Sequence, residues 1–141
     1  MTLPVVEEGQ AIAVPSGTPA ELLIVEHSPD DVELMILELN KAGFKNNHVT
    51  VEDEPEFRHA LCSHPFDAIL CDFNLPTWTG MDALRELRSS DKITPFILVT
   101  GSLGEEAAVD CIKQGVSDFV LKDHMSRLPH ALRRAISDRK L

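Results

Sequence analysis

Side chains that could perform chemistry stand directly after four short apolar runs of the sequence: Glu26 with His27, Asp72, Thr100 and Lys122. A short apolar run that stops at a polar residue is typical of a buried strand. Parallel strands end at one edge of their sheet, where open α/β proteins place ligand chemistry. Each residue type is common at the start of a loop, so one such position means little. The four together predict a single site assembled from distant parts of the sequence.

The residue types at these strand ends suit the transfer of a phosphoryl group. The Asp72 carboxylate can act as an oxygen nucleophile and form an acyl phosphate. The protein then has little covalent work to do, because catalysis consists mainly of holding the charge on the transferring oxygens. The Lys122 ammonium would balance that charge, and the Thr100 hydroxyl would donate a hydrogen bond to one of the oxygens. We therefore expect the site to be built around Asp72.

The composition indicates one folded domain and argues against two classes of partner. The chain has 141 residues, of which 43% are hydrophobic and 26% are charged, as in ordinary globular domains. Its net charge of −10 would repel a phosphate backbone, so we expect no nucleic-acid partner. The apolar runs are far shorter than the roughly 20 residues of a membrane-spanning helix, so we expect no membrane partner either.

Residues 1–20 contain several prolines and glycines and no sustained apolar period. We interpret them as a flexible N-terminal leader, with a partner-binding arm as the alternative. No export signal is visible, so the expected location is the cytoplasm. The cysteines, Cys62, Cys71 and Cys111, are odd in number and scattered. This pattern favours buried or semi-buried thiols in a reducing compartment over disulfides or a zinc site.

The elements that must position the site alternate between strands and helices. Apolar runs predict strands at residues 22–25, 48–51, 68–71, 95–99 and 119–121. Three of the helices between them begin with a capping-box spacing: Ser28 with Asp31, Thr79 with Asp82, and Ser102 with Glu105. The second helix is predicted at residues 53–62, the fourth has Ala108, Val109 and Ile112 as its apolar residues, and the last begins near Pro129. Helix-length crossovers predict a single α/β domain with a mostly parallel five-stranded sheet and five helices on its two faces.

The order of the site residues resembles the receiver domain of bacterial two-component response regulators of the chemotaxis-regulator type. The resemblance rests on the acid after the first strand, the lone Asp of DFNLP at residues 72–76, the Thr after the fourth strand and the Lys after the fifth. It covers residues 21–141, so the receiver domain would occupy that range. It implies a doubly wound, flavodoxin-like sheet in the order 2-1-3-4-5, with Asp72 as the phosphoacceptor and a Mg²⁺ ion beside it.

The resemblance also implies roles for individual residues. Asp72 and the backbone carbonyl of Asn74 would bind the metal directly, and Glu26 would act through water. Thr100 and Phe119 would form the switch, although Phe119 is equally well explained as ordinary core.

Partners follow from the same resemblance. A histidine kinase or a histidine phosphotransfer protein would donate the phosphoryl group. The chain would catalyse at most its own phosphoryl transfer and autodephosphorylation, so it would not be an enzyme in the usual sense. The face built from the fourth helix, the fifth strand and the fifth helix would change, and a homodimer could form through it. The chain would be either a stand-alone shuttle or a module linked to an output domain in a longer protein.

Two residues depart from the family's pattern. His27 stands where the family usually has a second metal-binding acid. Imidazole suits transition metals better than Mg²⁺, so Mg²⁺ would bind weakly or be replaced by Mn²⁺ or another divalent ion. The alternative function is therefore a receiver-like interaction module that works without phosphorylation. Asp123 stands where the family commonly has a cis proline, so we expect a trans peptide bond after Lys122.

Other chemical readings of the sequence are weaker. An aspartyl-phosphate hydrolase of the haloacid dehalogenase type needs a second acid two residues after its nucleophile, where this chain has Asn74. Trp78 is expected to cover part of the loop that follows Asp72. Four further histidines lack a shared face and are interpreted as surface residues: His59, His64, His124 and His130.

Overall fold

The fold is given by a computed structural model that describes residues 17–90, 93–101 and 104–139. Its strands are β1 (Ala20–Val25), β2 (Asn46–Val51), β3 (Ala68–Cys71), β4 (Phe96–Thr100) and β5 (Asp118–Leu121). Its α-helices are α1 (Pro29–Lys41), α2 (Glu54–Ser63), α3 (Gly80–Ser89), α4 (Glu105–Lys113) and α5 (Leu128–Asp138), and a 3-10 helix, η2 (Lys122–Arg127), joins β5 to α5. Each predicted strand and helix is present, with ends shifted by one or two residues.

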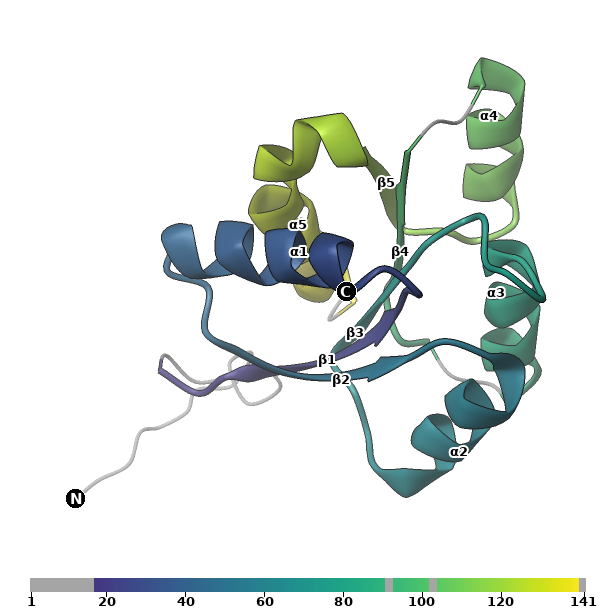
Figure 1. The fold of residues 1–141 in the computed structure, drawn as a ribbon, viewed down its shortest axis with the longest axis horizontal. Coiled ribbons are helices and arrows are strands. Elements are labelled where there is room, and N and C mark those ends of the chain that lie inside the picture. Colours follow the sequence, from purple (N-terminus) through teal and green to yellow (C-terminus); the bar gives the residue numbers. More distant parts are fainter. Residues whose placement is uncertain (1–16, 91–92, 102–103, 140–141) are drawn as a thin grey trace.

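The strands form one parallel sheet that is covered on both faces. They are hydrogen-bonded in the order β2-β1-β3-β4-β5, and all neighbouring pairs are parallel. Figure 1 shows α1 and α5 on one face of the sheet and α2, α3 and α4 on the other. This arrangement confirms the predicted doubly wound, flavodoxin-like fold. In the described part of the chain, none of the helices is long and apolar enough to cross a membrane.

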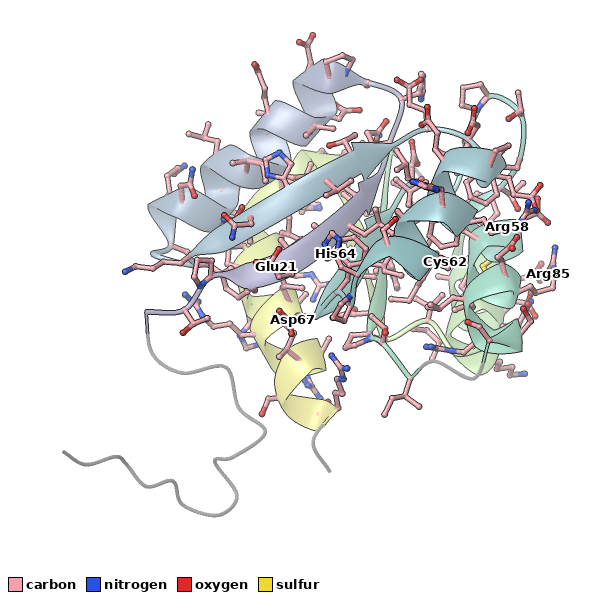
Figure 2. The ribbon with its side chains drawn as sticks, turned by 90° about the horizontal axis from the view of Figure 1, so that it is seen from below. Glu21, Arg58, Cys62, His64, Asp67 and Arg85 are labelled. Carbon is pink, nitrogen blue, oxygen red and sulfur yellow. The ribbon has the colours of Figure 1, made fainter. Side chains whose placement is uncertain are left out.

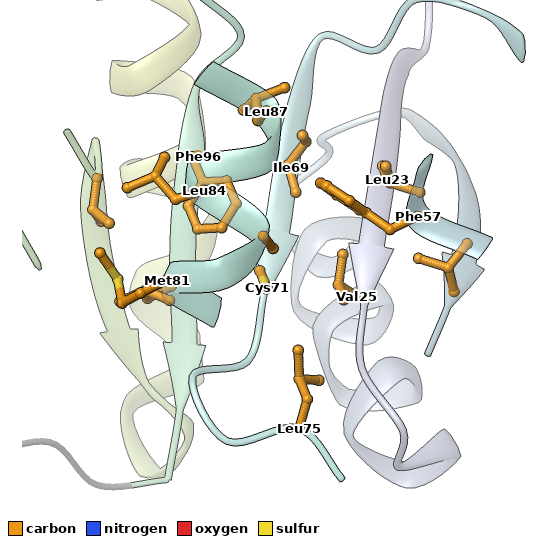
Figure 3. Packing of buried hydrophobic residues seen from close by; sticks show 14 of the residues in the cluster. Leu23, Val25, Phe57, Ile69, Cys71, Leu75, Met81, Leu84, Leu87 and Phe96 are labelled. Carbon is orange, nitrogen blue, oxygen red and sulfur yellow. The ribbon is translucent and has the colours of Figure 1, made fainter. Parts of the chain in front are cut away.

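Alternate side chains of the inner strands β1, β3 and β4 pack into two separate apolar cores, whereas the edge strand β2 is largely exposed. Leu23 and Val25 of β1 belong to the core under α2 and α3, where they lie near Phe57 (Figure 3). Leu22 and Ile24 of the same strand belong to the core under α1 and α5. Because successive side chains point to opposite faces, a strand covered on both faces is apolar throughout. Polar side chains can therefore appear only where such a strand ends.

The register between β1 and β3 places Glu26 and Asp72 side by side, since each is the first residue after a paired strand end. The Asp72 N–H donates to the Val25 carbonyl at 3.0 Å. At the opposite edge of the sheet, the Glu21 N–H donates to Asp67 Oδ2 at 2.7 Å, and the Asp67 N–H donates to the Glu21 carbonyl at 2.7 Å (Figure 2). The two strands are thus fixed at both ends. A slip by one residue would turn every buried side chain to the wrong face.

The predicted capping boxes at α1 and α3 have different outcomes. At α3 the box is complete, because the Thr79 hydroxyl accepts from the Asp82 N–H at 3.2 Å and the Asp82 carboxylate accepts from the Thr79 N–H at 2.9 Å. At α1 the Ser28 hydroxyl accepts from the Asp31 N–H at 3.3 Å. The Asp31 carboxylate does not return this bond, so the box at α1 is only half formed.

Helix α4 differs from its prediction at its start and on its surface. It begins after Gly104, which makes no side-chain capping bond, and the predicted cap Ser102 lies outside the described residues. Of its three predicted apolar residues, Ala108 is buried, whereas Val109 and Ile112 are 55% and 45% exposed. The helix also packs through Cys111, which is buried. Apolar residue type alone therefore does not identify the buried face of this helix.

The three cysteines are free thiols in two different environments. Cys71 and Cys111 are buried as predicted, and burial raises the pKa of each thiol above its ordinary value. A thiol with a raised pKa carries little reactive thiolate. Cys62 is exposed on α2, so the prediction of a buried or semi-buried thiol was wrong for this residue (Figure 2). Its place on the solvent side of the helix explains the difference.

We predict that Gly80→Ala destabilises the protein, because Gly80 is packed directly against the backbone of the loop after β3. An added Cβ would lie 2.7 Å from the Asp72 carbonyl oxygen and 3.1 Å from Phe73 Cα. Overpacking of this kind costs about 1–3 kcal/mol of unfolding free energy, which urea denaturation would measure. Gly101→Ala is the control, since its Cβ would meet nothing within 4 Å. Equal unfolding midpoints for the two variants would contradict the prediction.

Candidate functional site

The carboxyl edge of the sheet brings three of the selected side chains into contact. Lys122 Nζ lies 3.0 Å from Asp72 Oδ2 and 2.9 Å from Glu26 Oε1. Both carboxylates are buried, with side-chain exposures of 7% for Asp72 and 0% for Glu26. Lys122 reaches them because it is the first residue after β5, and its peptide bond to Asp123 is trans, as expected. The residues that directly follow β1, β3 and β5 therefore contact one another at the carboxyl edge of the sheet.

The loop that follows Asp72 is closed by its own backbone. Asp72 Oδ1 accepts a hydrogen bond from the Asn74 N–H at 3.3 Å. Asn74 forms an isolated antiparallel bridge with Thr79, and the Gly80 N–H donates to the Phe73 carbonyl at 2.9 Å. These bonds hold Asn74 next to the carboxylate. The role of its backbone carbonyl as a metal ligand stays a prediction.

The charges at this edge shift the pKa values of Glu26 and Lys122. Burial raises the pKa of Glu26 above its ordinary value, against the lowering effect of Lys122 and of the Ser28 N–H. Burial would lower the pKa of Lys122, but its bonds to Asp31, Glu26 and Asp72 outweigh burial and raise it. The ammonium is therefore fully charged at neutral pH. It is the positive charge that allows buried carboxylates to lie so close together.

Asp31 is a member of this cluster that the sequence reasoning missed. Its Oδ2 atom lies 2.7 Å from Lys122 Nζ, and the ammonium donates a hydrogen bond to it. From sequence Asp31 was interpreted as the acid of a helix cap. The one available signal was its place in the first turn of the helix that directly follows Glu26 and His27. A side chain in this first turn can reach the cluster at the end of β1, as the contact with Lys122 shows.

His27 lies beside the two buried carboxylates with 49% of its side chain exposed. Its Nδ1 atom is 3.6 Å from Glu26 Oε2. Among the described residues, one ligand atom each from Glu26, His27 and Asp72 lie within 4.8 Å of one another, as in a metal site. Glu26 Oε1 is buried without a hydrogen-bond partner in the described part of the chain, although Lys122 is near. The donors and this unsatisfied oxygen fit a divalent cation.

The two predicted switch residues, Thr100 and Phe119, lie on the neighbouring strands β4 and β5. Thr100 is fully buried at the end of β4, and its hydroxyl has no hydrogen-bond partner among the described residues. Phe119 on β5 is partly buried and packs against the core under α2 and α3. It also lines an open groove of about 720 Å³ along α4, together with Val109 and Ile112. The contacts of Phe119 are thus compatible both with core packing and with a role in switching.

Trp78 belongs to the loop that follows Asp72, and its ring packs against α2. Its ring meets Phe57 edge-on with centroids 5.4 Å apart, and its Nε1–H donates to the Glu52 carbonyl at 3.0 Å. These contacts join the loop to α2 and to the end of β2, and the predicted cover of the loop by Trp78 stays a prediction. The four further histidines are all exposed, in agreement with their interpretation as surface residues: His59, His64, His124 and His130.

The chain is similar to part of several curated bacterial regulators. It is 31% identical over 100 residues to the response regulator protein PilR of Pseudomonas aeruginosa, a match that covers 71% of this chain and 22% of PilR. It is 29% identical over 128 residues to the C4-dicarboxylate transport transcriptional regulatory protein DctD of the same species, covering 90% of this chain and 27% of DctD. The chain thus spans about a quarter of the length of these relatives.

A solved structure has the same fold. It is the receiver domain of a sensor histidine kinase from Pseudomonas aeruginosa, with a magnesium ion coordinated in its active-site cleft. The two chains are 26% identical with a TM-score of 0.71, over 85% of this chain and 99% of that one. The family model for the response regulator receiver domain matches residues 22–133. With the carboxylates and the lysine at the same sheet edge, this match shows that the chain belongs to the response regulator receiver domain family of two-component signalling.

Proposed function

We propose that this chain is the phosphoacceptor of a phosphorelay, with Asp72 as the residue that is phosphorylated. The observation that supports this role best is the 3.0 Å contact between the buried Asp72 carboxylate and the Lys122 ammonium. A nucleophilic oxygen and the cation that balances the incoming charge are thereby side by side. The donor is a histidine kinase or a histidine phosphotransfer protein, since receiver domains are generally phosphorylated by such proteins.

The reaction is a transfer from nitrogen to oxygen. A carboxylate oxygen of Asp72 bonds to phosphorus while the bond between phosphorus and the imidazole nitrogen of the donor breaks, and that nitrogen keeps the electron pair. Lys122 donates hydrogen bonds to the oxygens of the transferred group, and the buried hydroxyl of Thr100 turns towards one of them. The product is an acyl phosphate on Asp72.

A divalent cation fits the cluster beside Asp72. Glu26, Asp72 and the backbone carbonyl of Asn74 are the oxygen donors that would hold it, and Mg²⁺ prefers such ligands. When bound, the ion neutralises charge on the phosphoryl oxygens. His27 adds a nitrogen donor to this cluster. The site is therefore less selective for Mg²⁺ and accepts Mn²⁺ or another transition metal more readily than an all-oxygen site.

The response to phosphorylation passes through Thr100 and Phe119. When Thr100 turns towards the phosphoryl group, the space it leaves at the end of β4 becomes available to Phe119 of the adjacent strand β5. The groove along α4 that Phe119 lines would then change shape, and with it the face formed by α4, β5 and α5. This face would serve a homodimer or a linked output domain. The leader at residues 1–20, the domain boundary at residue 21 and a cytoplasmic location stay predictions.

A second candidate function is a receiver-like interaction module that works without phosphorylation. The observation that favours it is His27, which lies 3.6 Å from Glu26 where the family usually has an acid. Loss of that negative charge weakens the attraction for Mg²⁺. The two functions differ in one measurable property, which is whether Asp72 takes up a phosphoryl group.

We predict that Asp72→Asn abolishes phosphorylation by acetyl phosphate, because an amide is not a nucleophile of this kind. Intact-protein mass spectrometry would detect the added phosphoryl group in the wild type. The fluorescence of Trp78, the sole tryptophan, should also respond to Mg²⁺ with beryllofluoride in the wild type and not in Asp72→Asn. Asp123→Asn, an exposed site beside Lys122, is the control. A wild type that is neither phosphorylated nor responsive would favour the interaction module.

A further prediction concerns the metal. His27→Asp should tighten Mg²⁺ binding about tenfold, in the range typical of changes in the ligand environment of a metal, and should weaken the preference for Mn²⁺ or Zn²⁺. Isothermal titration calorimetry with each ion measures both effects. His59→Asp makes the same change at an exposed position on α2 and should leave all affinities unchanged. Equal Mg²⁺ affinities for His27→Asp and the wild type would show that His27 does not determine metal binding.

A further inference from the structure

The shortest contact of the Lys122 ammonium is with Asp31, to which the proposed function assigns no role. Lys122 Nζ lies 2.7 Å from Asp31 Oδ2, compared with 2.9 Å from Glu26 Oε1 and 3.0 Å from Asp72 Oδ2. The contacts with Asp31 and Asp72 have the geometry of hydrogen bonds. The contact with Glu26 Oε1 is an ion pair that lacks hydrogen-bond geometry. Asp31 is therefore the best-placed acceptor for the ammonium.

The start of α1 is built so that the Asp31 carboxylate is free to reach Lys122. In a capping box this carboxylate would accept from the Ser28 N–H. That N–H donates instead to Glu26 Oε2 at 3.1 Å, while the Asp31 N–H still donates to the Ser28 hydroxyl at 3.3 Å. The helix is thus capped without the Asp31 side chain. Asp82, at the same position of α3, completes its box and stays at its own helix end.

Asp31 lies outside the group of ligand atoms that fits a metal, which consists of Glu26, His27 and Asp72. A divalent cation held by Glu26 and Asp72 would repel the Lys122 ammonium and occupy the carboxylates that attract it. Asp31 would then be the remaining anion at hydrogen-bond distance from the lysine. Asp31 on α1 also adds a negative charge to this cluster, which His27 does not.

We propose that Asp31 is a positioning residue that keeps Lys122 at Asp72 during phosphoryl transfer. The inference rests on the proposed function of Asp72. An ammonium has three donors, so one can stay on Asp31 while the others face the phosphoryl oxygens. Asp31 touches the lysine and not the reacting atoms. Its influence on the reaction passes entirely through Lys122.

The test compares variants of the full chain with phosphoramidate as donor at saturating Mg²⁺. Asp31→Asn should slow phosphorylation about tenfold, the effect of losing one charge-assisted hydrogen bond from the transition state. Asp31→Glu keeps the charge and should be closer to the wild type than to Asp31→Asn. Asp30→Asn removes the same charge from an exposed neighbour in the same helical turn and should leave the rate unchanged. Equal rates for Asp31→Asn and Asp30→Asn would overturn the proposal.

A double variant separates positioning from a general structural effect. If Asp31 acts through Lys122, adding Asp31→Asn to Lys122→Ala should produce no further loss of rate, because the two residues form one unit. A further loss would overturn the proposal. Failure of the proposed function has a different signature, since the wild type itself would then take up no phosphoryl group.

A measurement that needs no phosphoryl transfer completes the test. The NMR signal of the Lys122 ammonium, assigned by its absence in Lys122→Ala, should be visible in Mg²⁺-saturated wild type and in Asp30→Asn. In Asp31→Asn it should disappear, because an ammonium without its anchor exchanges protons faster with water. Persistence of the signal unchanged in Asp31→Asn would show that Asp31 does not hold the lysine, whatever the rates.

Discussion

The ion pairs of the Lys122 ammonium are the interaction on which the site depends. Buried carboxylates that lie close together repel one another, and each raises the free energy of the other's ionised form. One ammonium within 3.0 Å of Glu26, Asp31 and Asp72 makes their arrangement possible. The pairing of Thr100 with Leu121 in β4 and β5 sets the position of the next residue, Lys122. The register of the last two strands therefore determines whether the cluster forms.

The sheet explains why the polar groups collect at its edge. Strands that are covered on both faces can carry polar side chains only where they end, because a polar group within either core would lose its hydrogen bonds to water. In parallel strands these ends coincide. The bonds between Glu21 and Asp67 at the far edge hold β1 and β3 in register, and so align Glu26 with Asp72. Contacts remote from the site thus contribute directly to its geometry.

Much of the fold could be predicted from sequence, since apolar runs and capping residues act locally. The strands, the complete box at Thr79 and the order of elements follow from such signals. The strand order itself came from the family resemblance and is confirmed. The role of Asp31 could not be predicted, because an acid at that helix position can either close its own cap or bind a distant cation. Val109 and Ile112 are apolar like buried residues, and only the position of α4 against the sheet leaves them exposed.

Buried oxygen atoms without hydrogen-bond partners at the carboxyl edge of the sheet are the physical reason for assigning ligand binding to this edge. In the described part of the chain, Glu26 Oε1 and Thr100 Oγ1 are buried without hydrogen-bond partners. A buried group with no partner lowers stability by about 1–3 kcal/mol, which applies to Thr100 Oγ1, whereas the Lys122 ammonium 2.9 Å from Glu26 Oε1 offsets part of this cost there. A cation at Glu26 and a phosphoryl oxygen at Thr100 would satisfy both atoms. Ligands that bind only the folded chain would then remove this cost and stabilise the fold.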